Sequence, residues 1–319
     1  MPVAPDDRLL TKVARLYHED GCSQFDVADR LGLSQAKVSR LLKEAKARGI
    51  VTVTVTSPVG VHTDLEADLE AAFELSEAIV VESAADGDQL LRDLGAAAAR
   101  HLETTLRPGM VLGISSWSDA LRATVDAMKP VNTLNGLKVV QILGGVGDPD
   151  AERHATELAR TLALTVRGEA ALLPVPGVVA SAAARDVLSD EPSVRRALDL
   201  FPTVSVALVG IGAVEPSPRL ARSGNVFSDD ELADLEQRGA VGDICLRFFD
   251  DAGIPLVGPL ADRVLGMDLA TLAGVPRRIA VAAGERKLSA IAGALRGGLL
   301  TQLVTDQRTA EALLEHPAG

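Results

Sequence analysis

The sequence predicts an α/β fold, in which an N-terminal winged helix-turn-helix precedes a Rossmann-like domain with a mostly parallel sheet. Three observations predict it. Residues 24–42 (QFDVADRLGLSQAKVSRLL) have the apolar spacing, the glycine and the serine of two short helices joined by a tight turn. From about residue 78 onward, short β-branched runs alternate with helical stretches. The composition, 47% hydrophobic but only 3% aromatic, suits an aliphatic core between a sheet and its helices.

The helix-turn-helix is built from three expected helices. The first covers residues 8–18, and Val27 and Ala28 begin the apolar side of the second, after which Gly32 allows a tight turn. Ser34 is suited to cap the third helix, whose apolar residues repeat at i, i+3, i+4 and i+7: Val38, Leu41, Leu42 and Ala45. The last two helices therefore pack at a steep angle and leave the outer face of the third helix free.

That outer face is polar and basic. Residues 34–50 hold five basic side chains and one acid, Glu44. Gln and Arg can read base edges in the major groove, whereas Lys and a helix N-terminus suit phosphates. We therefore predict operator DNA as a partner, contacted by Ser34, Gln35, Lys37, Ser39, Arg40 and Lys43. The alternative is a solvated charged face on a small helical hairpin.

The charge is divided unequally along the chain. The net charge is −12, but residues 1–55 hold nine Lys or Arg against seven Asp or Glu, which leaves 23 against 37 for the remainder. The acidic remainder would repel DNA without the right sequence while the basic helix engages it. Cys22 and Cys245 fit no metal spacing and are expected as free thiols. There is no 18-residue apolar run and no secretory signal, so we expect a cytoplasmic protein without a membrane partner.

A boundary is expected after the third helix. Residues 51–55 (VTVTV) alternate as a strand, which predicts a wing or a short hairpin, and residues 57–62 form a short linking segment before a helix at 65–73. We place a DNA-binding domain at residues 1–56 and a second domain at residues 57–319.

The second domain is predicted to hold a largely parallel sheet covered on both faces, because apolar strands alternate with helices. In such sheets, ligands bind outside the carboxyl ends of the strands. Strands are expected at residues 78–81, 110–114, 138–143, 170–175, 205–212, 278–284 and 302–306, and helices at 90–103, 119–128, 155–163 and 308–314.

Small and polar residues gather where these strands end. Residues 113–119 (GISSWSD) offer hydroxyls and backbone N–H groups at a helix N-terminus, which suits a phosphate, although Ser118 can equally be a simple helix cap. The segment lacks the lysine of a Walker loop, which argues against nucleotide hydrolysis. The glycines at 144, 145 and 147 either let the backbone approach a ligand or form a tight turn that needs positive φ.

Two further positions carry charge near strand ends. Asp243 and Arg247 lie four residues apart and form either an ion pair or a ligand contact. Lys287 follows a strand and opens a helix, where it is a natural partner for a phosphate or a sugar hydroxyl. The predicted effector-binding residues are Ser115, Ser116, Ser118, Gly144, Gly145, Asp243, Arg247 and Lys287.

With these segments in order, the chain resembles the SorC family of bacterial transcriptional regulators over nearly its full length. The resemblance rests on the helix-turn-helix and on LGISSWSDAL, VVQILGGVG, VALVGIGA, RSGNVFSDDEL, GAVGDICLRFFD and VAAGERKLSAIAGALRGGLLTQLVTD. It implies an effector domain similar to ribose-5-phosphate isomerase and glucosamine-6-phosphate deaminase, a tetramer, and operator affinity that changes when a sugar, polyol or sugar phosphate binds.

The chain also departs from the family pattern. Ser118 and Ala120 stand where many relatives have a glycine and a threonine, so the loop is expected to hold its ligand differently or to hold a different ligand. Phe25 occupies a position that is more often polar, and it is expected to pack on the first helix or on a neighbouring subunit.

The competing interpretation is a sugar-phosphate isomerase-like enzyme with a DNA-binding appendage. Such an enzyme needs a general base aimed at the sugar, but the sequence offers no combined carboxylate and histidine constellation near the strand-end loops, and Asp119, Asp148, Glu152 and Asp243 are isolated candidates only. We therefore predict a regulator of a carbohydrate-metabolism operon, with no catalytic residue, metal or cofactor.

Overall fold

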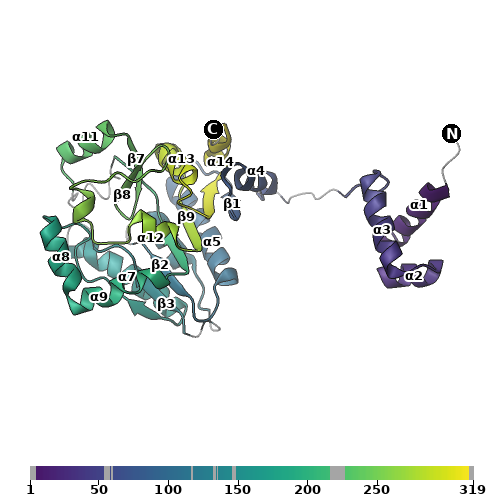
Figure 1. Cartoon of the computed structure of the whole chain (residues 1–319), viewed down its shortest axis with the longest axis horizontal. Coiled ribbons are helices and arrows are strands. Elements are labelled where there is room, and N and C mark those ends of the chain that lie inside the picture. The colour runs from purple at the N-terminus through teal and green to yellow at the C-terminus, as the bar shows by residue number, and fades with distance from the viewer. Residues whose placement is uncertain are drawn as a thin grey trace. The chain divides into compact units, whose positions relative to one another are not determined.

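A computed structural model describes residues 5–53, 58, 60–115, 118–131, 134, 136–145, 149–215 and 227–315, without the side chains of residues 5, 6 and 149–155. The chain divides into two compact units, Met1–Pro58 and Val59–Gly319. Figure 1 labels the helices and strands of both units. No helix in these ranges is long and apolar enough to cross a membrane.

The first unit consists of three helices, α1 (Pro5–His18), α2 (Gln24–Leu31) and α3 (Gln35–Ala47). Ser23 and Asp26 form a reciprocal capping box at the start of α2, and Gly32 ends that helix at φ 64°, where glycine pays no steric penalty. The Ser34 hydroxyl accepts a hydrogen bond from the Lys37 amide and caps α3, as the sequence predicts. The core beneath the helices is small, with Leu10, Val13, Val27, Val38 and Ala45 fully buried.

The expected strand after α3 is not formed in the described residues. Residues 51–53 lie outside any helix or strand, and residues 54 and 55 lie outside the described ranges. The prediction of a strand is therefore wrong for residues 51–53. Alternating β-branched residues fit a pleated surface, but a strand also needs a neighbouring strand to pair with, and no strand of the described first unit offers one.

The second unit contains a seven-stranded sheet in the order β1-β10-β9-β5-β2-β3-β4. Every neighbouring pair is parallel, which agrees with the prediction. The strand order reverses between β2 and β5, since β3 follows on one side and β9 on the other. The strands are β1 (Glu77–Val81), β2 (Val111–Ile114), β3 (Lys138–Gln141), β4 (Glu169–Ala171), β5 (Val206–Val209), β9 (Arg277–Val281) and β10 (Gln302–Asp306).

Helices cover both faces of this sheet, as Figure 1 shows. One side carries α5 (Gly87–Thr105), α6 (Asp119–Ala127) and α7 (Pro149–Thr165). The other side carries α4 (Thr63–Phe73), α9 (Pro192–Leu198), α11 (Asp229–Gln237), α12 (Leu269–Ala273), α13 (Leu288–Arg296) and α14 (Gln307–Glu315), while α8 (Ala182–Asp190) buries none of its own residues.

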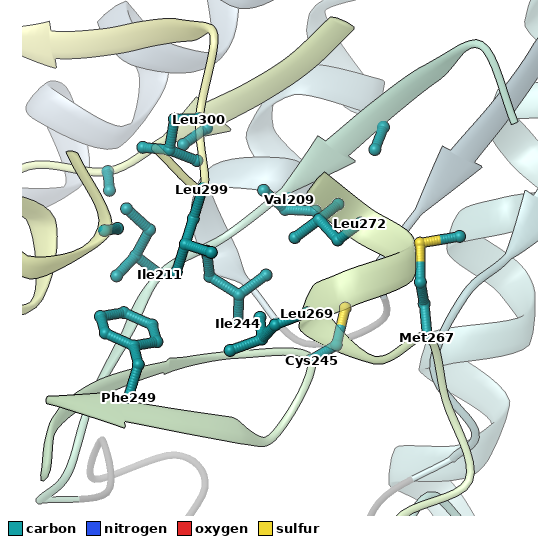
Figure 2. Packing of buried hydrophobic residues seen from close by; sticks show 14 of the residues in the cluster. Val209, Ile211, Ile244, Cys245, Phe249, Met267, Leu269, Leu272, Leu299 and Leu300 are labelled. Carbon is teal, nitrogen blue, oxygen red and sulfur yellow. The ribbon is translucent and has the colours of Figure 1, made fainter. Parts of the chain in front are cut away.

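The central strands are apolar throughout because alternate residues enter two different cores. In β5, Val206 and Leu208 pack into one hydrophobic cluster, whereas Ala207 and Val209 pack into the other. Figure 2 shows the second cluster, in which Val209 lies near Leu272 of α12 and the small sheet contributes Ile244 and Phe249. This period-two division explains why the strands show runs of hydrophobic residues instead of an alternation.

A smaller antiparallel sheet, β6-β7-β8, follows the carboxyl end of β5. Its strands are β6 (Gly212–Ala213), β7 (Ala240–Ile244) and β8 (Arg247–Asp250), and short 3-10 turns occur at Phe201–Thr203, Ala261–Arg263 and Glu285–Lys287. Cys245 and Leu246 form the two-residue turn between β7 and β8, with φ 55° and 58°. Both are non-glycine residues in the left-handed region, a conformation that costs free energy.

The outer edge of β1 is covered by glutamate side chains from α4. The Ala78 and Val80 amides donate hydrogen bonds of 2.9 Å to the carboxylates of Glu70 and Glu66. Residues four apart on a helix and two apart on a strand repeat at similar distances, so the two carboxylates match two successive outward N–H groups. This edge is therefore protected from pairing with another chain.

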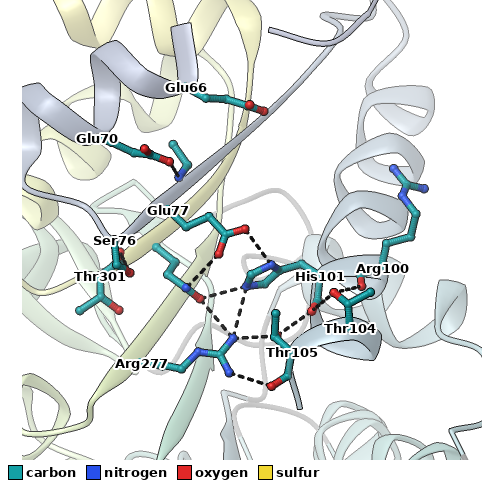
Figure 3. A network of polar contacts seen from close by, with 12 residues as sticks. Glu66, Glu70, Ser76, Glu77, Arg100, His101, Thr104, Thr105, Arg277 and Thr301 are labelled. Atoms are coloured by element: carbon teal, nitrogen blue, oxygen red, sulfur yellow. Dashed lines mark hydrogen bonds and ion pairs between the residues drawn. The ribbon is translucent and has the colours of Figure 1, made fainter. Parts of the chain in front are cut away.

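A polar network joins the starts of three strands to α5 (Figure 3). His101 is buried; its Nδ1 lies 3.3 Å from the Glu77 carboxylate, and its Nε2 lies 3.0 Å from the Gln302 amide oxygen. Arg277 donates a hydrogen bond to the Thr105 hydroxyl at 2.8 Å. The network lies at the amino ends of β1, β9 and β10, which is the edge opposite to the predicted ligand site.

Candidate functional site

The carboxyl ends of β2 and β5 form the centre of the candidate site. The strand order reverses between these two strands, so their connections leave in opposite directions. In sheets of this type, ligands bind outside the carboxyl ends of the strands at such a reversal. Ser118 caps α6 just after β2, and residues 210–212 follow β5. A β-carbon built at Gly210 would lie 2.7 Å from the Ser118 β-carbon, and one at Gly212 would overlap the Asp243 carboxylate. The two glycines therefore let α6 and β7 approach the end of β5 closely.

Lys287 lies at this place within electrostatic range of two carboxylates. It ends the 3-10 turn after Gly284, which has φ 101°, and it follows β9. Burial lowers the pKa of Lys287, and the negative charges of Asp243 and Asp119 oppose that change. The structure thus brings together one lysine from the end of β9, one aspartate from the small sheet and one from the first turn of α6.

Asp243 is the more strongly perturbed partner. Burial raises the pKa of its carboxyl group from 3.8 to about 6, although the hydrogen bond from the Leu246 amide and the charge of Lys287 favour the ionised form. That hydrogen bond is 2.8 Å long and also holds the strained turn between β7 and β8. A desolvated carboxyl group and a desolvated amine beside a helix N-terminus can bind hydroxyl groups and an anion together.

The serines after β2 are already engaged within the protein. The buried Ser115 hydroxyl accepts a hydrogen bond from the Gly210 amide at 3.3 Å, so it joins the ends of β2 and β5. The Ser118 hydroxyl accepts from the Leu121 amide at 3.3 Å, which is the helix-cap role that the sequence left open. Ser116, the third predicted hydroxyl, lies outside the described residues.

Gly144 and Gly145 have no free N–H group to offer a ligand. The Gly144 amide donates to the Leu265 carbonyl at 3.0 Å, and the Gly145 amide donates to the Val175 carbonyl at 2.9 Å. Neither glycine has positive φ, and a β-carbon at Gly144 would lie 2.6 Å from the Val175 oxygen. The tight-turn interpretation is therefore wrong at these two positions. Glycine at 144 is required by close packing of one chain segment on another, and Gly147 lies outside the described residues.

Asp243 and Arg247 do not form the ion pair that their spacing suggested. The Arg247 guanidinium donates to the carbonyls of Ala261 at 2.6 Å and Val264 at 3.1 Å. The two residues lie on opposite strands of a hairpin, where Arg247 pairs with Ile244. Cross-strand partners share a face and successive residues alternate, so Asp243 points to the other face of the sheet. A spacing of four residues predicts an ion pair only within a helix, whereas residues 243 and 247 belong to a β-hairpin.

The predicted DNA-contact residues lie on α3. Ser34, Gln35, Lys37, Arg40 and Lys43 are exposed, whereas Ser39 is half-buried. Arg48, by contrast, is paired with Asp7 at 2.9 Å and with Glu44, so it ties α3 to α1. Phe25 of α2 is 69% exposed, which shows that the expected packing on the first helix is wrong. The first unit thus presents a cationic outer face on its third helix.

Sequence reasoning missed two features of these sites. Asp119 was treated as an isolated carboxylate, although its place in the first turn of a helix after β2 already brought it to the edge where Lys287 lies. Ala36 was passed over because it is neither polar nor charged, but it is exposed on the outer face of α3. Helical periodicity alone could have found it.

Metal ligation and thiol chemistry have no support in the residues seen. Within the described ranges, no group of three or more His, Cys, Asp or Glu side chains is placed to hold a metal ion. Cys22 and Cys245 are free thiols, and burial raises the pKa of the Cys245 thiol to about 12, which keeps it protonated at neutral pH.

Comparison with known proteins gives consistent matches to regulators. A family model for a sugar-binding domain matches residues 57–315, and a model of the MarR family matches residues 14–59. The deoxyribonucleoside regulator of Bacillus subtilis is 33% identical over 308 residues, covering 96% of this chain and 97% of that protein. The transcriptional regulator LsrR of Escherichia coli is 33% identical over 311 residues, covering 97% and 95%.

A solved structure also matches over nearly the full length. The crystal structure of the full-length sorbitol operon regulator SorC from Klebsiella pneumoniae has a TM-score of 0.73 and 31% sequence identity. The match covers 98% of this chain and 100% of that one. Both units described above therefore have counterparts in one regulator.

Proposed function

Because this chain belongs to the SorC family of sugar-responsive transcriptional regulators, we propose that it binds operator DNA through α3 and a phosphorylated sugar or polyol at the Asp243–Lys287 site. It is a DNA-binding regulator of a carbohydrate-metabolism operon, with an effector controlling its affinity for the operator. The names of its relatives point to sorbitol and to deoxyribonucleosides, which are polyol and pentose compounds.

The observation that carries the effector proposal is the position of Lys287, which lies close enough to Asp243 and Asp119, beside the α6 N-terminus, for their charges to act on it. The domain is acidic as a whole, so an anion needs a local cation and local N–H groups. Lys287 supplies the cation and α6 supplies the helix terminus, while Asp243 accepts hydrogen bonds from sugar hydroxyls. We assign Ser118 and Asp119 to the edge of this site, and Arg247, which bonds to two carbonyls, to its support.

We also propose that the chain acts without catalysis, as a homotetramer in the cytoplasm. Its relatives are transcriptional regulators, which supports a protein that binds its effector without reacting with it. An effector then works by binding one state of the regulator more tightly than the other, which requires two sites and no reaction.

The experiment begins with DNA selected from a random duplex library by the full chain. A thermal-shift screen of sugars, polyols and their phosphates then identifies compounds that bind the chain, and titration of the selected duplex shows which of them changes DNA affinity. We expect Lys287→Ala to abolish calorimetric binding of that compound and to leave DNA binding intact. Arg286→Ala is the matched control, because Arg286 is the neighbouring cation but pairs with Glu215 at 3.4 Å. Undiminished affinity in Lys287→Ala, or a preference for the unphosphorylated sugar, would exclude the phosphate role.

A further inference from the structure

The outer face of α3 contains alanines as well as cations. An α-helix turns by about 100° per residue, so the side opposite the buried Val38 and Ala45 lies near residues 36, 40, 43 and 47. These residues are Ala36, Arg40, Lys43 and Ala47, and all of them are exposed. Ala36 lies in the first turn of the helix, the part that contacts base edges in helix-turn-helix proteins.

Arg40 is held against the turn that contains Ala36. Its Nε atom donates a hydrogen bond of 3.4 Å to the Ala36 carbonyl, so the side chain runs back along the helix toward residue 36. Among the residues that the structure describes, no acceptor is recorded for the two terminal nitrogens of Arg40. Those two nitrogens form the pair that binds the O6 and N7 atoms of a guanine.

We propose that Ala36 is a specificity-determining residue, whose methyl group contacts the methyl group of a thymine next to the guanine that Arg40 reads. The proposal rests on the proposed function, since it assigns base contacts to the same helix. Ala36 and Arg40 lie one turn apart on one face, so their partners are neighbouring base pairs in one half of the operator.

Thymine is the base that this geometry favours. The Ala36 methyl group neither donates nor accepts a hydrogen bond, and the thymine methyl is the apolar group that the four base pairs present in the major groove. A cytosine at the same place would set its amino group against the methyl and leave that donor without a partner. A small side chain also lets the helix approach the bases closely, which the adjacent guanidinium needs for two hydrogen bonds.

The test uses the duplex selected by the full chain, with each thymine replaced in turn by deoxyuridine, which lacks the methyl group. We expect one position in each half of the duplex to lose affinity about fourfold, the factor that corresponds to one buried methyl group. In Ala36→Gly the same replacement should have no further effect. A 7-deazaguanine at the neighbouring guanine should weaken binding of the wild type but not of Arg40→Ala.

Ala47→Gly is the matched control, because it makes the same change on the same exposed face at the end of α3. Ala47→Gly should still lose about fourfold in affinity when that thymine is replaced by deoxyuridine. Binding of random duplex checks that each variant is folded. The proposal is overturned if no deoxyuridine costs more than about twofold, or if Ala36→Gly retains the loss. Failure to select any sequence would instead contradict the proposed DNA-binding function, so the two failures are distinguishable.

Discussion

The Asp243 carboxyl group makes stability depend on pH in an uncommon direction. Its pKa rises from 3.8 to about 6 on folding because it is buried, so the folded chain binds this proton more tightly than the unfolded chain. The contribution of Asp243 to the free energy of unfolding is therefore largest below pH 4 and is lost as the pH rises toward about 6. Salt-bridged carboxylates behave in the opposite way.

We predict that Asp243→Asn removes this pH dependence. On going from pH 4.5 to pH 7, the free energy of unfolding of the variant should rise by on the order of 1–3 kcal/mol relative to that of the wild type. Urea unfolding at the two pH values measures it. The exposed Asp230 of α11 provides the control, since Asp230→Asn should leave the difference unchanged. If the free energy of unfolding of Asp243→Asn depended on pH as that of the wild type does, the carboxyl group would be solvated.

Arg40 and Lys43 are both exposed cations of α3, but we predict different roles for them. Arg40→Ala should weaken binding of the selected duplex by about 1–3 kcal/mol and relax its selectivity, because Arg reads a base. Lys43→Ala should lower affinity evenly for selected and random DNA and reduce the salt slope by about one, because Lys contacts a phosphate. Fluorescence titration over a range of salt concentrations measures both. If Arg40→Ala lowered affinity equally for selected and random DNA, Arg40 would not read a base.

The contact between α5 and α6 depends on one glycine. A β-carbon at Gly95 would lie 2.5 Å from the backbone carbon of Ala123, a distance that only movement of a whole helix can relieve. Since α6 begins at the candidate site, such a movement would also displace Ser118 and Asp119.

We predict that Gly95→Ala destabilises the second unit by about 1–3 kcal/mol through overpacking. Gly87→Ala is the control in the same helix, because no atom of the described residues lies within 4 Å of a β-carbon there and the φ of Gly87 is not positive. That variant should be neutral or more stable by up to about 1 kcal/mol. Chemical denaturation compares the two, and equal effects would mean that the helices separate without cost.

Hydrophobic periodicity predicted the long helices and the buried strands, because each of these buries a continuous apolar face. It failed where a residue's partner is distant in the sequence. Residues 51–53 alternate like a strand, but no strand in the described part of the first unit pairs with them. Gly144 is small because residues 175–177 pack on it. The Cys245–Leu246 turn has none of the glycine or asparagine that marks a hairpin, so the strands around it could not be recognised.

The two units have opposite charge balance, and this division affects how the molecule finds its site. The basic face of α3 is attached to a second unit with a strong excess of acid. The excess lowers affinity for DNA in general, so most of the binding free energy must come from contacts that only the right sequence provides. A single recognition helix reads few base pairs, which is insufficient for one site in a genome.

Pairing of copies about a two-fold axis resolves this deficit, because two helices read two half-sites on one face of the duplex. We predict that the selected duplex is dyad-symmetric and that residues 57–319 alone form an oligomer at micromolar concentration in analytical ultracentrifugation. Exposed apolar side chains of the second unit, such as Leu164 and Val257 at 79% and 76%, are available for such contacts. Inserting five base pairs, about half a helical turn, between the half-sites should reduce affinity to that of a single half-site, because the two helices would then face opposite sides of the DNA. If residues 57–319 were monomeric, or if the insertion left affinity for the duplex unchanged, each chain would bind its operator alone.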